Sequence, residues 1–319
     1  MNNQLNGFDE SRPEFIGFNA FYAKTISPYL ESLEQERVAA VKNANVIGLA
    51  ASAFVFALAA FVYSKTGSIP FFIGISVVAL LLGFGTRHII AHKISGEIKQ
   101  FIMDNVCGFV GLDYACDNFS APDLEIWRTN KLLPGYDRVN FEDQMSGTAH
   151  GAGFIFCEAH LETKHRDKDG NTTWSTSFRG ILLTINCPHK FLGRTVVLRD
   201  AGWFNAKKKS GMKRVGLVDP VFEDIFEAYS TDQVEALYLL TPDFMQRLVD
   251  LETTISGKRI RFGFLQRQLY IAIEAPDQFE IGSMFKTLLG TERTQKILDE
   301  IGAIYNVIDG VMKPLKKTR

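Results

Sequence analysis

Two long apolar segments with a short polar break between them constrain this chain more than any other feature of its sequence. Residues 43–64 and 66–86 contain no Asp, Glu, Lys, Arg or His, and Lys65 separates them. At about 1.5 Å per residue, a helix of either segment spans roughly 30 Å, the thickness of the hydrocarbon core of a bilayer. The break is too short for the second helix to continue in the same direction. The sequence therefore predicts a transmembrane helical hairpin over residues 43–87.

Basic residues predict how this hairpin is oriented. Six of them flank the hairpin and one lies in its turn: Lys24, Arg37, Lys42, Arg87, Lys93 and Lys99 against Lys65. The positive-inside rule then favours both termini in the cytoplasm and a multi-pass topology. Four cysteines without close pairs agree with a reducing compartment.

The segments beside the hairpin have helical patterns. An apolar stripe at spacings of three and four begins at Phe15, so residues 1–42 are expected to form amphipathic helices. Ser27 before Pro28 resembles an N-cap followed by a first-turn proline, which predicts two helices that meet there. Residues 88–135 are expected to form a juxtamembrane helix and a linker, with a turn of helix from Ala121 to Trp127.

Residues 136–319 are expected to form a cytosolic α+β domain with a mainly antiparallel sheet of six or seven strands and helices on one side. Segments 153–166 and 172–185 flank a polar turn at 167–171, which predicts a β-hairpin. Further strands are expected at 194–199, 215–218, 259–264 and 268–274. Helices are expected at 222–226, on both sides of Pro242 with Thr231 and Thr241 as N-caps, and over 292–312.

Motifs in this domain resemble the bacterial family called domain of unknown function 3137. They are an F-x-G strand, a K-F-x-G-x-T strand, a Y-S-x-D-Q-V-E-A segment, a Leu-Thr-Pro step and an L-Y-I strand. The matching positions are Phe178, Gly180, Lys190, Phe191, Gly193, Thr195, Phe222, Glu223, Phe226, Tyr229, Ser230, Asp232, Gln233, Glu235, Ala236, Leu240, Thr241, Pro242, Leu269, Tyr270 and Ile271. The chain departs from the pattern at Ala228, where the family often has Val.

The resemblance covers roughly Tyr136 to Leu289. It implies anchoring in the bacterial cytoplasmic (inner) membrane by paired helices and a cytosolic domain, with no established activity. It also suggests a LemA-type membrane protein as a partner.

Other residue patterns do not predict catalysis or a cofactor. His88 and His92 share one helical face but have no third metal ligand nearby. Cys187 and His189 are too close along a turn for a thiolate–imidazole pair, and a buried cysteine is the simpler interpretation.

The glycine-rich segment 147–153 lacks the lysine of a phosphate loop, so a bulge or kinked sheet edge is expected. Asp232 and Glu235 at a helix start are expected to complement its dipole.

A basic loop is the one candidate contact site. It combines two aromatic and five basic residues with no acidic residue from 201 to 218: Trp203, Phe204, Lys207, Lys208, Lys209, Lys213 and Arg214. Each basic residue near an anionic leaflet contributes about 1 kcal/mol to binding, so lipid contact competes here with an ordinary solvated loop.

The sequence thus predicts a membrane-anchored binding or scaffolding module for another membrane protein or for the anionic lipid surface. The alternative is an enzyme of unrecognised class that acts on lipid or envelope precursors at the membrane. A transporter is disfavoured because neither apolar segment carries a charge. A net charge of −1 favours no nucleic-acid partner.

Overall fold

The computed structural model describes residues 7–67, 69–168, 170–199, 211–217, 219–279 and 287–316. Within these ranges it describes the backbone, but not the side chains, of residues 40, 44, 71, 79–95 and 313–316. The chain divides into two compact units. We call residues 1–105 with 280–295 the helical unit, and residues 106–279 with 296–319 the sheet unit. The boundaries expected at 42/43, 87/88 and 135/136 stay predictions.

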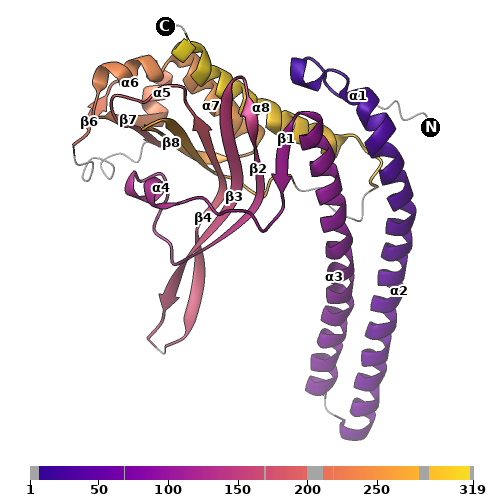
Figure 1. Cartoon of the computed structure of the whole chain (residues 1–319). Coiled ribbons are helices and arrows are strands. Elements are labelled where there is room, and N and C mark those ends of the chain that lie inside the picture. The colour runs from indigo at the N-terminus through magenta and orange to yellow at the C-terminus, as the bar shows by residue number, and fades with distance from the viewer. Residues whose placement is uncertain are drawn as a thin grey trace. The chain divides into compact units, whose positions relative to one another are not determined.

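The helices and strands follow one another along the chain as shown in Figure 1. The helical elements are η1 (Pro13–Phe15), α1 (Phe18–Phe21), η2 (Tyr22–Ile26), α2 (Ser27–Thr66), α3 (Ile69–Phe109), α4 (Glu125–Thr129), α5 (Pro220–Ile225), α6 (Gln233–Leu239), α7 (Pro242–Thr254) and α8 (Glu292–Lys316). The strands are β1 (Leu112–Ala115), β2 (Arg138–Ala149), β3 (Ala152–Arg166), β4 (Thr172–Asn186), β5 (Thr195–Arg199), β6 (Lys213–Val215), β7 (Phe226–Ser230), β8 (Lys258–Leu265) and β9 (Gln268–Glu274).

The predicted break between helices at Ser27 is wrong. Ser27 has helical backbone angles, and its hydroxyl donates to Glu31 Oε1 at 3.0 Å instead of capping a helix. The preceding turn, η2, is a π turn with wider hydrogen bonding. Such a turn lets the helix continue into Pro28, whose ring and missing N–H would otherwise interrupt it.

The helical unit is built on the pairing of α2 with α3, which run side by side in opposite directions (Figure 1). Near the turn, the ring of Phe72 lies 5.5 Å from that of Phe56 and 5.7 Å from that of Tyr63. At the other end of the pair, Tyr29 stacks on Phe101 with centroids 3.7 Å apart. Gly67, in the left-handed conformation at φ +63°, ends α2 and allows the reversal.

Within the residues described, one helical stretch, 13–66, is long and apolar enough to cross a membrane. Only 11% of its most apolar window is buried, so it does not resemble the core helix of a soluble domain. The second predicted span lies in α3, whose side chains at 79–95 are outside the described residues.

In the described residues, the sheet unit contains nine strands in the order β1-β2-β3-β4-β9-β8-β5-β7-β6, and all neighbours are antiparallel. The α+β class is therefore confirmed, as are the two predicted hairpins, β3–β4 and β8–β9. The expected number of strands was too low. Three strands had no specific prediction: β1, β2 and β7.

Both faces of the sheet are covered, so the expectation of helices on one side is wrong. Phe244 of α7 packs on Phe262, and Tyr305 of α8 packs on Phe154, on one face. On the other face, Trp127 of α4 packs edge-on against Tyr270 at 5.1 Å. Trp127 belongs to a second buried cluster with Leu124, Leu132 and Leu133. The turn of helix expected from Ala121 to Trp127 is present as α4, but no sequence pattern indicates that it covers a face of the sheet.

The β3–β4 hairpin extends beyond the rest of the sheet as a two-stranded arm (Figure 1). β2 pairs with β3 only up to Glu162, and β9 pairs with β4 only from Gly180 onward. Most side chains from Lys164 to Thr176 are consequently exposed on both faces. A two-stranded ribbon has little independent stability, so its own cross-strand contacts must hold it.

A substitution at Gly180 tests the contact between β4 and β9. Gly180 has φ +156° and lies opposite Glu274, where an added Cβ would come 2.0 Å from the carbonyl oxygen of Ile273. We predict that Gly180→Ala destabilises the protein by about 3 kcal/mol, because strand β9 must shift away from β4. Gly135→Ala, which meets no atom within 4 Å, is the control. Equal melting temperatures of the two variants in detergent would contradict this account of the β4–β9 contact.

Candidate functional site

The predicted lipid-contact loop is described only in part. Trp203, Phe204, Lys207, Lys208 and Lys209 lie outside the residues that the structure describes. Lys213 and Arg214, the other two members, are exposed on the edge strand β6. Arg214 forms an ion pair with Glu223 at 3.0 Å. Glu223 lies after the stretch 201–218, which contains no acidic residue. Lipid contact by this loop stays a prediction.

The family motifs meet at a loop–helix contact at one end of the sheet unit. The carboxylate of Glu235 in α6 accepts hydrogen bonds from the backbone N–H groups of Leu192 and Gly193, both at 2.8 Å. An added Cβ on Gly193 would lie 2.8 Å from the Cβ of Asp232, so only glycine permits this approach. We call this contact the Glu235 clamp. It joins the K-F-x-G turn to the helix of the Y-S-x-D-Q-V-E-A segment.

A second set of hydrogen bonds joins the same two segments next to the Glu235 clamp. Arg194 N donates to Thr231 Oγ1 at 2.8 Å, and Thr231 N donates to Arg194 O at 3.0 Å. The buried hydroxyls of Thr195 and Ser230 lie 2.9 Å apart. The motif residues therefore satisfy one another, which is a structural role.

Asp232, not Thr231, is the N-cap of α6. Its side chain accepts from Val234 N at 3.1 Å and Glu235 N at 2.9 Å. The predicted cap at Thr241 is confirmed, since its hydroxyl accepts from Phe244 N at 3.3 Å. The expectation that Asp232 complements the helix start is also confirmed, whereas Glu235 binds a neighbouring loop.

Three other sequence candidates have simple structural explanations. Cys187 is buried, and burial raises the pKa of its thiol to about 12, so the reactive thiolate is disfavoured. His150 and Gly151 form a two-residue turn between β2 and β3, with φ +54° and +86°. The bulge expected in this glycine-rich segment is therefore wrong. No set of three or more metal-ligating side chains is present in the described part of the chain, and the His88 and His92 side chains are outside it.

A small polar cleft lies where β3, β4 and the segment after β9 meet. Glu158 is 7% exposed and accepts a hydrogen bond from Gln278 N at 2.9 Å. Next to it, Arg179 forms a two-fold ion pair with Asp277, with Nε 2.8 Å from Oδ1. The cleft has a volume of about 30 Å³, which is room for a water molecule or two. No local sequence pattern predicts this cleft, because its residues come from separate strands and a loop.

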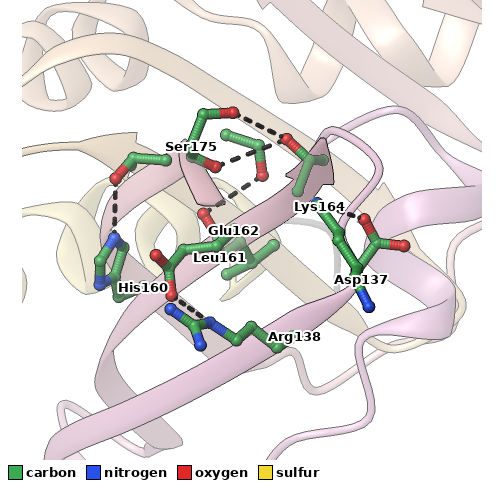
Figure 2. A network of polar contacts seen from close by, with 10 residues as sticks. Asp137, Arg138, His160, Leu161, Glu162, Lys164 and Ser175 are labelled. Carbon is green, nitrogen blue, oxygen red and sulfur yellow. Dashed lines mark hydrogen bonds and ion pairs between the residues drawn. The ribbon is translucent and has the colours of Figure 1, made fainter. Parts of the chain in front are cut away.

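The arm carries a polar network at its base (Figure 2). Arg138 on β2 pairs with Glu162 on β3 at 2.5 Å, and its guanidinium lies 4.0 Å from the ring centroid of Trp174 on β4. His160 contacts Thr176 Oγ1 at 2.9 Å, and Lys164 N donates to Asp137 at 2.6 Å. These contacts link three strands where the ladder narrows to two, so they stabilise the arm.

The Glu235 clamp yields a direct prediction. Glu235→Ala removes the acceptor of two backbone N–H groups, and charge-assisted hydrogen bonds of this kind contribute about 1.5–3 kcal/mol each when buried. Because Glu235 is half-exposed, we expect a loss of about 2 kcal/mol in the free energy of unfolding. Glu235→Gln should lose less, since one acceptor oxygen remains. Asp224→Ala, at an exposed position on α5, is the control in thermal melts, and a loss equal to that of Glu235→Ala would contradict the clamp.

Comparison with known proteins finds one family whose sequence model matches part of the chain. Residues 176–313 match the sequence model of a family described as "Protein of unknown function (DUF3137)". No curated protein matches the chain. Among solved structures, the crystal structure of the mycobacterial trehalose monomycolate transport factor A, TtfA, aligns with 10% identity and a TM-score of 0.32. That alignment covers 64% of this chain and 95% of the other, and at this TM-score it supports no conclusion.

The family match begins later than the motifs indicated, at 176 instead of about 136, and continues to 313 through most of α8. It includes the Glu235 clamp, Gly180 and both strands of the β8–β9 hairpin. The resemblance expected from these motifs is confirmed over residues 176–313, which match the sequence model of the DUF3137 proteins of unknown function.

Proposed function

We propose that this protein is a membrane-anchored binding module, in which the α2–α3 hairpin crosses the bacterial cytoplasmic membrane twice and the sheet unit lies in the cytoplasm. The bound partner is another membrane protein, such as the LemA-type protein that the family resemblance suggests, or the anionic lipid surface. The following observations support the anchor and the binding role separately.

The exposed apolar surface of the helical unit carries the proposal. Leu49 and Phe54 are each 74% exposed and Phe61 is 61% exposed, all within the first apolar segment. Ile69 and Ile73 at the start of α3 are 60% and 56% exposed. Each such side chain gains about 2 kcal/mol on transfer from water to an apolar medium. An apolar surface of this extent is typical of contact with lipid.

Binding is favoured over catalysis by the nature of the surfaces. The buried polar residues around Glu158 enclose only about 30 Å³, too little for an organic substrate. Two larger hollows, of about 480 Å³ beside Glu274 and about 620 Å³ beside Arg267, lie open to solvent. The exposed arm and the exposed apolar residues of α6 are extended surfaces of the kind that contact other macromolecules. An enzyme acting on lipid or envelope precursors is the alternative, and the hollow of about 480 Å³ bordered by Arg179, Arg259 and Glu274 is the place where a substrate would fit.

The anchor is tested by extraction and by labelling of intact cells. We expect the full-length protein to stay in the membrane pellet after washing at high pH and to require detergent for release. A cysteine introduced by Lys65→Cys in the last turn of α2 should react with a membrane-impermeant maleimide in spheroplasts. Lys168→Cys at the tip of the arm should react only after lysis, with the wild-type chain as background.

Two results would contradict the proposal. One is release of the wild-type protein without detergent, and the other is labelling of Lys168→Cys before lysis. Purification of the full chain in detergent, followed by identification of co-purifying membrane proteins, then tests the partner.

A further inference from the structure

Helix α6 of the sheet unit is apolar on its outer face as well as on its inner face. Val234, Leu237 and Tyr238, at spacings of three and four, are 67%, 47% and 74% exposed. Ala236 and Leu239 on the opposite side are buried. A helix that covers a sheet ordinarily has a polar outer face. The outer face of α6 therefore needs an explanation beyond the packing of the sheet unit.

The exposed face continues from α6 onto the neighbouring turn. Leu192 at the tip of this turn is 84% exposed, and the Glu235 clamp fixes its backbone against α6. Glu235 and Tyr238 are neighbours on the helix surface, three residues apart. Leu192 thus borders the exposed stripe. We call Leu192, Val234, Leu237 and Tyr238 the α6 face.

Basic residues border the α6 face on both sides. On the side of the turn, Lys190 and Arg194 flank Leu192 and are exposed. On the other side, Gln233 Nε2 donates to the backbone oxygen of Lys213 at 3.2 Å, which places β6 beside α6 (Figure 1). Among the described residues, none of these three cations forms an ion pair within 4.0 Å. The α6 face is an apolar centre with a positive border.

Three acidic residues lie close to this basic border. Asp232 is engaged as the N-cap of α6, and Glu235 accepts two backbone N–H groups in the clamp. Glu223 is paired with Arg214 of β6. A hydrogen-bonded carboxylate keeps its negative charge, so these three acidic residues offset three of the four basic residues Lys190, Arg194, Lys213 and Arg214. The region around the α6 face therefore carries an excess of one positive charge among these residues.

We propose that the α6 face docks the sheet unit on the anionic leaflet of the membrane that anchors the chain. Apolar side chains enter the boundary between headgroups and acyl chains, tyrosine favours this interface, and Lys and Arg lie at the lipid phosphates. Tethering raises the local concentration of the lipid surface, so a small patch suffices for binding. This inference rests on the proposed membrane anchor.

The test uses full-length protein in lipid nanodiscs with a bimane fluorophore on Tyr238→Cys. In discs that contain phosphatidylglycerol, we expect a blue shift of the emission and quenching by a doxyl lipid, both reduced by salt. Phosphatidylcholine discs should show neither effect. Replacing Lys190, Arg194 and Lys213 together by Gln should lower the docked-to-free ratio by about a hundredfold, since each cation contributes about fivefold. A label on Gln246→Cys, at an exposed position of α7, is the control and should stay unquenched.

Each outcome bears on the proposal. Incorporation of the protein into discs without quenching at position 238 overturns the lipid docking and leaves the anchor intact, whereas failure to incorporate overturns the anchor. A blue shift that is independent of lipid charge and of doxyl lipid identifies a protein surface as the occupant and also overturns the proposal. If Tyr238→Cys impairs folding, Leu192→Cys on the turn gives the same readout.

Discussion

The structure of the sheet unit depends on the contact between β4 and β9. The strand order places the strands β1 to β4, each beside the next in sequence, on one side of this contact and the strands β5 to β9 on the other. Seven residue pairs from Gly180↔Glu274 to Asn186↔Gln268 form the contact. It joins segments about 90 residues apart in the chain, and Gly180 permits it because no side chain can fit beside the backbone of β9. Without it, the nine-stranded sheet would separate into two smaller sheets, each with further exposed edges.

Once this contact forms, the second half of the sheet brings the family motifs together. The Glu235 clamp, the Asp232 cap and the Thr195–Ser230 pair use polar side chains for internal hydrogen bonds. These internal hydrogen bonds give the motif residues a role in folding. The same arrangement leaves the outer side of α6 free, and this is the surface that we propose meets the membrane.

Local patterns predicted the elements whose signals are contained in a few neighbouring residues. The β3–β4 hairpin follows from its polar turn and from alternation, and the cap at Thr241 follows from a threonine before a proline. β7 was missed because Phe222, Phe226 and Tyr229 have helical spacing although the strand is buried on both faces. The prediction of an N-cap at Ser27 is wrong because no short sequence pattern indicates the π turn that accommodates Pro28. The cleft at Glu158 was missed because its residues are distant in sequence.

The sequence by itself determined the presence of a long apolar helical segment, the α+β class of the remainder and the resemblance of residues 176–313 to the DUF3137 proteins. These properties depend on composition, on the spacing of apolar residues and on short motifs. Each of them can be recognised without knowing which distant segments make contact. Only the tertiary structure decided the order of the nine strands, the cover of both sheet faces and the surroundings of α6. The physical reason is that a side chain's burial depends on which distant segment packs against it. For Val234, Leu237 and Tyr238 no such segment is present in the described part of the chain, and their apolar side chains face outward.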